Sequence, residues 1–185
     1  MKLSVVVPHM YGLKDVDFML KKCVKSLVGH DELIIVANDG LGYGASVNLG
    51  MRLATGDHII VANNDTWLTN GTLRDLALNN VITTPKVVPE PRDSLPRSFF
   101  CVPRIIYEDI YEKYGDFFDE RFEGGYWEDD DLHDRLWESE IAMGTIETVV
   151  VHHLNGGGLT MKQIGEQEYF DKNRDVYFEK KGTGG

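Results

Sequence analysis

The sequence is poor in cysteine and has no long hydrophobic run, and each shortage excludes a class of protein. Its two cysteines, Cys23 and Cys101, lie in apolar stretches without metal-ligand spacing, which excludes a disulfide framework and a zinc site. No stretch approaches the roughly 20 apolar residues of a membrane span. The apolar run Val5–Val7 is too short for a signal peptide. We therefore expect a cytoplasmic protein without a membrane span.

Positive charge is also scarce, since 19 Lys and Arg stand against 30 Asp and Glu, for a net charge of −11. Such a surface is unsuited to neutralising the phosphates of a nucleic-acid duplex. What the sequence does contain is 42% hydrophobic residues in a chain of 185, enough for one compact domain with a core. We expect a single domain over 1–185, with a helical tail over about 161–185.

Short apolar runs alternate with helical periodicity in the N-terminal third. Buried strands are expected at Leu3–Val7, Leu33–Ala37 and His58–Ala62. Between them, helical spacing is found over Val16–Leu27 and over 43–56, each followed or closed by a glycine. This alternation predicts an α/β fold, whose ligands bind beyond the carboxyl ends of the strands.

The remainder of the chain has a mixed pattern. Helices are expected over 69–80, 104–114 and 128–143, and strands over 98–102 and 145–152. The stretch Pro85–Pro96 holds four of the six prolines and is expected to be a surface loop.

Acidic residues concentrate between Asp116 and Asp134, where nine acids lie. Most are expected on a solvated face at the start of a helix, with Asp131 and Arg135 paired at i, i+4. Asp129 is different, because it lies within about 60° of the apolar stripe that contains Leu132. An inward-facing carboxylate among other acids is suited to act as a general base. A buried cap or a charge partner is the alternative.

Polar residues follow the third expected strand, at Asn63, Asn64 and Asp65. An aspartate flanked by amides offers oxygen ligands to Mg²⁺ or Mn²⁺, and such an ion completes its shell with substrate phosphates. His152 and His153 end a late strand, and either could add an imidazole ligand, which favours Mn²⁺. A surface or hydrogen-bonded histidine is the alternative for both. The pattern fits a nucleoside diphosphate.

A glycine-rich turn offers a different interpretation. Gly40, Gly42 and Ala45 satisfy the dinucleotide fingerprint G-x-G-x-x-[GA]. The fingerprint belongs after the first strand of such a fold, whereas here it follows the second and leaves the acidic segment without a role. An NAD-dependent oxidoreductase is therefore kept as an alternative.

In order and spacing, these motifs resemble the family-2 glycosyltransferases with the GT-A fold, particularly the rhamnosyltransferase-like branch. The similarity spans roughly Leu3 to Thr160. The opening VVVP resembles the family's first strand, and IIVANDG resembles the strand end that holds the nucleotide base and ribose. The segment YGASVNLGMRLATGDHIIVANNDT resembles the stretch that ends in the D-x-D motif. YGDFFDERFEGGYWEDDDLHDRL looks like the family's acidic block, and VVVHHLNGGGLT looks like its histidine strand.

The resemblance implies a metal-dependent, inverting glycosyltransferase of the hexosyltransferase type, which moves a sugar from a UDP-sugar to a hydroxyl acceptor. It implies that Asp65 binds Mn²⁺ or Mg²⁺ as the last position of the D-x-D motif, that His152 or His153 completes the metal site, and that Asp129 is the catalytic base. Donor contacts are assigned to Pro8, Asn38, Asp39, Asn48, Asn63 and Asn64. Weaker acceptor contacts are assigned to Tyr126, Trp127 and Glu128.

The sequence departs from the family at Asn63, where an aspartate is frequent, so free metal is expected to bind weakly. The chain ends soon after the histidine strand, so acceptor recognition is expected from loops or from another protein. A glycan, a lipid-linked glycan, a protein and a modified nucleic-acid base all fit as acceptor, and the oligomeric state is open. A non-catalytic nucleotide-sugar-binding module is a further alternative.

Overall fold

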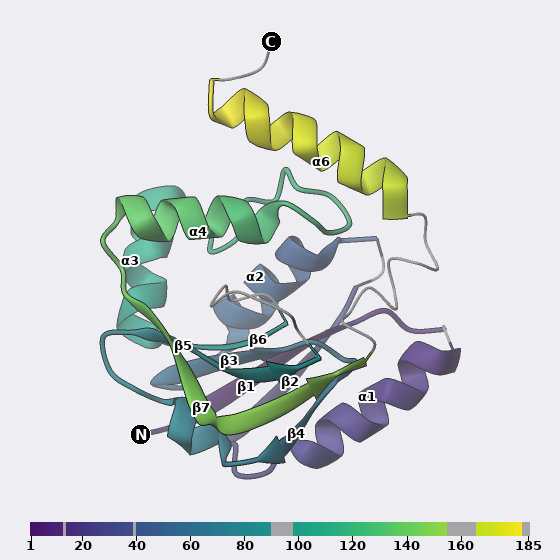
Figure 1. The fold of residues 1–185 in the computed structure, drawn as a ribbon, viewed down its shortest axis with the longest axis vertical. Helices are drawn as coiled ribbons and strands as arrows, with labels where there is room; N and C mark the ends of the chain where they lie inside the picture. The colour runs from purple at the N-terminus through teal and green to yellow at the C-terminus, as the bar shows by residue number, and fades with distance from the viewer. Residues whose placement is uncertain (13, 39, 90–97, 155–165, 183–185) are drawn as a thin grey trace.

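The computed structural model describes residues 1–12, 14–38, 40–89, 98–154 and 166–182, which fold around a mixed sheet of seven strands in the order β2-β1-β3-β6-β5-β7-β4 (Figure 1). The strands are β1 (Leu3–His9), β2 (Glu32–Ala37), β3 (His58–Ala62), β4 (Thr66–Asn70), β5 (Ile82–Val88), β6 (Phe99–Pro103) and β7 (Met143–His153). The helices are α1 (Lys14–Ser26), α2 (Tyr43–Leu53), α3 (Arg104–Tyr114), α4 (Glu128–Glu138) and α6 (Glu166–Lys180), with a 3-10 turn η1 at Leu73–Leu76. This architecture confirms the α/β class expected from the sequence.

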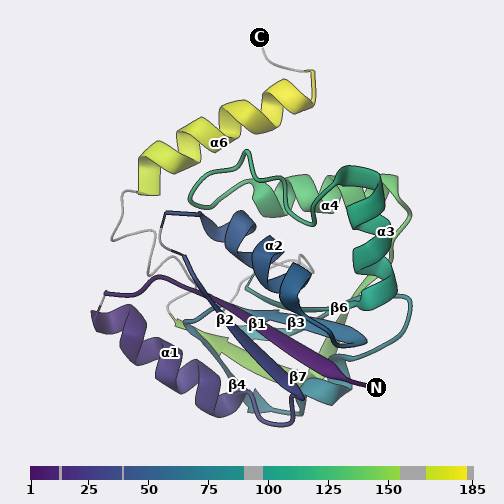
Figure 2. The ribbon, with the colours of Figure 1, turned by 180° about the vertical axis from the view of Figure 1, so that it is seen from behind.

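Helices cover both faces of the sheet, as the two opposite views show (Figures 1 and 2). One face packs against α2, α3 and α4, and its core includes Val6, Met51 and Leu132. The other face packs against α1 and η1, and its core includes Val5 and Cys23. Because neighbouring residues of β1 are buried on opposite faces, the strand is apolar throughout instead of alternating.

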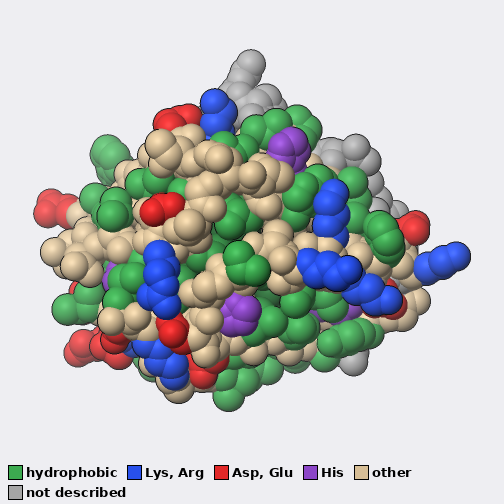
Figure 3. Space-filling model, turned by 90° about the horizontal axis from the view of Figure 1, so that it is seen from below, with side chains coloured by type: hydrophobic (Ala, Val, Ile, Leu, Met, Phe, Trp, Pro, Cys, Tyr) green, Lys and Arg blue, Asp and Glu red, His purple; other side chains and the backbone are tan. Residues whose placement is uncertain are grey.

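Basic side chains are visible on the face that carries α1, although the chain as a whole is acidic (Figure 3). Helix α1 contains Lys21, Lys22 and Lys25. The acids of segment 116–134 belong to the other side of the sheet, where α4 lies (Figure 1). No helix in the described part of the chain is long and apolar enough to cross a membrane.

The helix expected over 69–80 is absent, and that prediction was wrong. Thr66–Asn70 instead pairs antiparallel with β7. The backbone hydrogen bonds to this distant strand outweigh the local preference of the segment. The chain then makes only η1, which starts with a capping box in which Thr72 and Asp75 each bind the other's backbone amide.

Three other boundaries differ from expectation. The expected loop Pro85–Pro96 begins inside β5, and its residues 90–97 lie outside the described residues. Helix α4 ends at Glu138 rather than at Met143, because Met143 begins β7 beside Ile82 of β5. The tail forms the helix α6, which lies over α4 (Figure 1).

Candidate functional site

Asp65 and His153 meet at one edge of the sheet. Asp65 follows β3, and the next residue, Thr66, pairs with His153 at the end of β7. The carboxylate Oδ1 of Asp65 lies 3.2 Å from Nε2 of His153, and both side chains are almost completely buried. An oxygen and an imidazole nitrogen are thereby brought together from strands that are far apart in the sequence.

His152 faces away from this pair, because side chains alternate between the two faces of a strand. Its ring stacks on Trp67, with centroids 5.6 Å apart and planes 18° apart. The ammonium of Lys22 lies 3.2 Å from the centre of the same Trp67 ring, on the side of α1. Of the two candidate histidines, His153 is therefore the one beside Asp65.

Asp65 and His153 supply a carboxylate oxygen and an imidazole nitrogen, which are atoms of the kinds that bind Mn²⁺ in proteins. Two ligand atoms about 2.1 Å from an ion, at neighbouring corners of an octahedron, lie about 3.0 Å apart, close to the 3.2 Å found here. No cluster of three or more His, Cys, Asp or Glu residues suited to a metal occurs in the described part of the chain. An ion held by these two residues would need phosphate or water for its remaining ligands.

Tyr43, at the start of α2, links this pair to the acidic helix α4. Burial raises the pKa of the Tyr43 hydroxyl, and the negative charges of Glu128, Asp129 and Asp65 raise it further. The hydroxyl therefore lies within electrostatic reach of all three carboxylates.

Asp129 is partly buried in the first turn of α4, but it is not the most buried acid there. Glu128 is 7% exposed and Asp131 is 4% exposed. The expected pairing of Asp131 with Arg135 is present at 2.9 Å, whereas its expected place on a solvated face was wrong. The side chains of Asp131 and Arg135 are only 5% and 8% exposed, because α6 and the segment 116–118 cover them.

Arg135 ties α4 to the chain that precedes it. Its guanidinium donates to the carbonyls of Asp116 and Phe117, at 3.1 and 2.7 Å, as well as to Asp131. Lys180 of α6 also pairs with Asp131. The helix that carries Asp129 is consequently anchored by a buried charge network.

The residues assigned to the donor lie in three different surroundings. Asn38 follows β2 and Asn63 follows β3, and each has a buried amide oxygen with no hydrogen-bond partner in the described structure. Asn64 hydrogen-bonds to Nδ1 of His9 at 3.0 Å, next to Pro8 in β1. Asp39 lies outside the described residues.

Asn48 of α2 is engaged by the protein itself. Its amide accepts from the backbone N–H of Phe118 at 2.9 Å and donates to the carbonyl of Phe118 at 2.8 Å. Because Asn48 is 1% exposed, its hydrogen bonds fasten the segment before α4 to α2. The side chain of Asn48, which the sequence assigned to the donor, therefore contacts Phe118.

Tyr126 and Trp127, assigned to the acceptor, belong to the turn 123–127 before α4. Both have left-handed backbones, with φ of 75° and 70°. The Tyr126 ring packs on Phe170 of α6, and the Trp127 ring packs on Phe170 as well as on Tyr177 and Phe178. These rings contact α6, which the sequence motifs did not connect with the site.

The fingerprint turn is also packed against the protein. Gly42 has a φ of 80°, and a Cβ at this position would lie 2.9 Å from the backbone nitrogen of Gly124. The glycine is therefore needed for a close approach between two segments of backbone. In a dinucleotide-binding turn, the corresponding approach is to a pyrophosphate.

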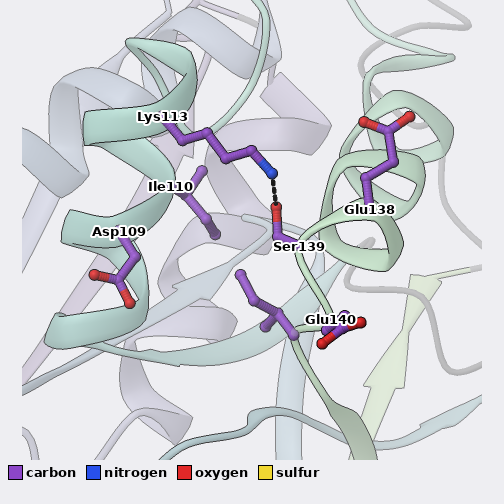
Figure 4. A pocket seen from close by; sticks show the side chains of 7 residues that line it. Asp109, Ile110, Lys113, Glu138, Ser139 and Glu140 are labelled. Carbon is purple, nitrogen blue, oxygen red and sulfur yellow. Dashed lines mark hydrogen bonds between the residues drawn. The ribbon is translucent and has the colours of Figure 1, made fainter.

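A separate hollow of about 400 Å³ lies between α3 and the end of α4 (Figure 4). Ile110 and Ile141 line it together with the carboxylates of Asp109 and Glu138. Lys113 reaches across it and donates to the hydroxyl of Ser139 at 2.8 Å. The hollow is at the opposite end of α4 from Asp129 and is not part of the candidate site.

The sequence matches no protein-family model. It also matches no curated protein sequence. Solved structures do share the fold. GalNAc-T7 in complex with UDP, GalNAc and Mn²⁺ has a TM-score of 0.65 at 11% identity, over 96% of this chain and 50% of that one.

Two other solved structures show the same likeness. Glucosyl-3-phosphoglycerate synthase from Mycobacterium tuberculosis, with Mn²⁺, UDP and phosphoglyceric acid, has a TM-score of 0.59 at 13% identity, over 100% of this chain and 78% of that one. A mutant Drosophila β-1,4-galactosyltransferase 7, with manganese, UDP-Gal and xylobiose, has a TM-score of 0.59 at 13% identity, over 78% of this chain. This chain spans only 65% of the galactosyltransferase. The likeness shows that this chain has the GT-A fold, as expected from the sequence.

Proposed function

We propose that this protein is a metal-dependent, inverting glycosyltransferase of family-2 type, which transfers a hexose from a UDP-sugar to a hydroxyl acceptor. The observation that carries the proposal is the buried pair of Asp65 and His153 at the sheet edge. Support also comes from the structural neighbours, which are complexes with UDP and manganese.

Asp65 and His153 would hold a Mn²⁺ or Mg²⁺ ion, with the donor diphosphate completing its shell. When bound, such an ion supplies Lewis-acid stabilisation of the charge that develops on the departing diphosphate. The buried amide oxygens of Asn38 and Asn63 can accept hydrogen bonds from the donor. Asn38 follows β2 and Asn63 follows β3, the strands on either side of β1. Ligands of α/β folds bind at such strand ends.

Asp129 would act as the general base. Its carboxylate takes the proton of the acceptor hydroxyl while the oxygen bonds to the anomeric carbon. The bond from that carbon to the diphosphate oxygen breaks, UDP leaves, and the configuration is inverted. The partly buried position of Asp129 in the first turn of α4 supports this role.

The donor can be identified by thermal unfolding with a panel of nucleoside diphosphate sugars, with and without Mn²⁺. A ligand that binds only the native state raises the unfolding temperature. We expect a UDP-sugar to do so only when Mn²⁺ is present. Stabilisation by NADH without a divalent ion would favour the oxidoreductase instead.

The base is tested by replacing Asp129 with asparagine, which keeps the size of the side chain and removes its basicity. We expect UDP affinity to stay within about twofold while turnover falls by about 10² to 10⁴, the contribution of a positioned base. A variant that turns over at the wild-type rate would exclude Asp129 from this role.

A further inference from the structure

Asn173 on α6 is fully buried, and its side chain hydrogen-bonds to the turn 123–127. Its amide nitrogen donates to the carbonyls of Glu123, Gly125 and Tyr126, at 2.8, 2.8 and 3.0 Å. Its amide oxygen accepts from the N–H of Glu123 at 3.1 Å. One side chain thus binds the turn at four points.

The turn has a shape that its own sequence does not favour. Gly124, Tyr126 and Trp127 all have positive φ, and the last two are residues that rarely adopt it. Such a backbone persists only where its surroundings over-determine it. The bonds from Asn173 supply that constraint, and the carbonyl of Trp127 begins α4 by accepting from Asp131 at 3.0 Å.

Gly124 connects the same turn to α2. Its carbonyl accepts from the N–H of Tyr43 at 2.8 Å. A Cβ on Gly124 would lie 2.6 Å from the ring of Tyr169 on α6. The turn is therefore held between α6 on one side and the start of α2 on the other.

Salt bridges hold α6 against the acidic segment around this turn. Lys172 pairs with Glu123 at 2.5 Å, and Lys181 pairs with Asp134 at 2.6 Å. Lys180 lies 2.7 Å from Asp119. These contacts connect α6 with the turn, with α4 and with the segment before it.

We propose that Asn173 is a positioning residue, which fixes the turn 123–127 so that Asp129, in the first turn of α4, is held in place relative to the start of α2. The proposal rests on the proposed function, because it assigns Asn173 a role in the geometry of the base. The hydrogen bonds of Asn173 are to backbone atoms of the turn. It acts by fixing the backbone from which α4 starts.

The experiment compares Asn173→Asp with the wild type and with Arg174→Ala. Aspartate keeps the size and the acceptor oxygen of asparagine. It replaces the amide nitrogen, which donates to three carbonyls, with a negatively charged oxygen that cannot donate. Arg174 is the matched control, because it is the next residue on α6 and its salt bridges are to Asp171 and Asp175 of the same helix. UDP affinity with Mn²⁺ is measured by calorimetry. Turnover is measured as release of UDP from the sugar donor with water in place of the acceptor.

We expect Asn173→Asp to lower the rate of UDP release at least about tenfold, as a misplaced base does, while UDP affinity stays within about twofold. Arg174→Ala should leave both unchanged. A purely structural role would lower UDP affinity and the unfolding temperature together. A wild-type release rate in Asn173→Asp would overturn the proposal.

Gly124→Ala perturbs the contact between the turn and α6 from the side of the turn. It is the second variant to measure if Asn173→Asp does not fold. Its methyl group would displace Tyr169, so the same loss of release rate with UDP affinity kept is expected. A wild-type rate in this variant would likewise overturn the proposal. If the wild-type protein itself neither binds UDP with Mn²⁺ nor releases it, the proposed function is wrong, which is a separate outcome from an unaffected variant.

Discussion

The buried ion pair between Asp131 and Arg135 gives a sharp prediction, because burial raises the expected cost of removing one partner about tenfold. A solvated i, i+4 pair on a helix contributes about 0.3–0.5 kcal/mol. Removing one partner of a buried pair costs about 3–5 kcal/mol, because the remaining charge is left uncompensated. The two side chains are 5% and 8% exposed, so the second value applies.

Arg135→Met keeps the length of the side chain and removes its charge and donors. The variant leaves the carboxylate of Asp131 with Lys180 and deprives two backbone carbonyls of their donor. Because Lys180 still compensates part of the charge, we expect a loss at the lower end of that range, about 3 kcal/mol in the free energy of unfolding.

Urea denaturation measures this loss, with Arg174→Met as the matched control. Arg174 is 44% exposed and pairs only with acids of its own helix, so its replacement should cost less than about 1 kcal/mol. A loss below about 1 kcal/mol for Arg135→Met would contradict the burial argument.

Other predictions concern the metal pair, the thiols and the docking of α6. His153→Ala should weaken Mn²⁺-dependent UDP binding at least about tenfold, whereas His152→Ala should not, since its ring stacks on Trp67; equal effects in calorimetry would contradict this. Burial raises the pKa of Cys23 and of Cys101 to about 12, so a disulfide reagent should react with neither until the protein unfolds. Burial would raise the pKa of Asp134, but hydrogen bonds from Lys181 and Tyr177 outweigh it and lower the pKa. The stability from Asp134 is therefore complete above its unfolded pKa of about 4 and is lost as the pH falls through the lower folded pKa. Amide exchange should show weaker protection of α6 at such acidic pH, and unchanged protection would refute the link.

Much of the fold could be predicted because local patterns coincide with the tertiary structure. The runs Leu3–Val7 and His58–Ala62 are apolar throughout since both faces of these strands are buried. Helix α3 was expected over 104–114 and spans Arg104–Tyr114. Gly115 directly follows α3 with a φ of 88° and marks the end of this helix.

The errors arise where a distant partner decides the structure. Thr66–Asn70 has no strong local preference and becomes a strand because β7 lies beside it. The pair Asp131 and Arg135 could be predicted from i, i+4 spacing, but its burial depends on α6, which comes about 40 residues later.

Site residues followed the same rule. Asp65 and Asp129 are predicted from strand-end and helix-stripe arguments and stay predictions, whereas the choice between His152 and His153 depends on which of them pairs with Thr66. Asn173 was missed altogether. Its signal in the sequence is one asparagine among the charges and aromatics of α6.

The central claim is that Asp65 and His153 form the protein part of a metal site for a nucleoside diphosphate. Calorimetric titration of the protein with UDP, with and without Mn²⁺, tests it most directly when Asp65→Ala is measured alongside. The account predicts that the wild type binds UDP only with Mn²⁺, and that the variant loses this binding. Binding of UDP that is independent of Mn²⁺, or that is unchanged in Asp65→Ala, would contradict it.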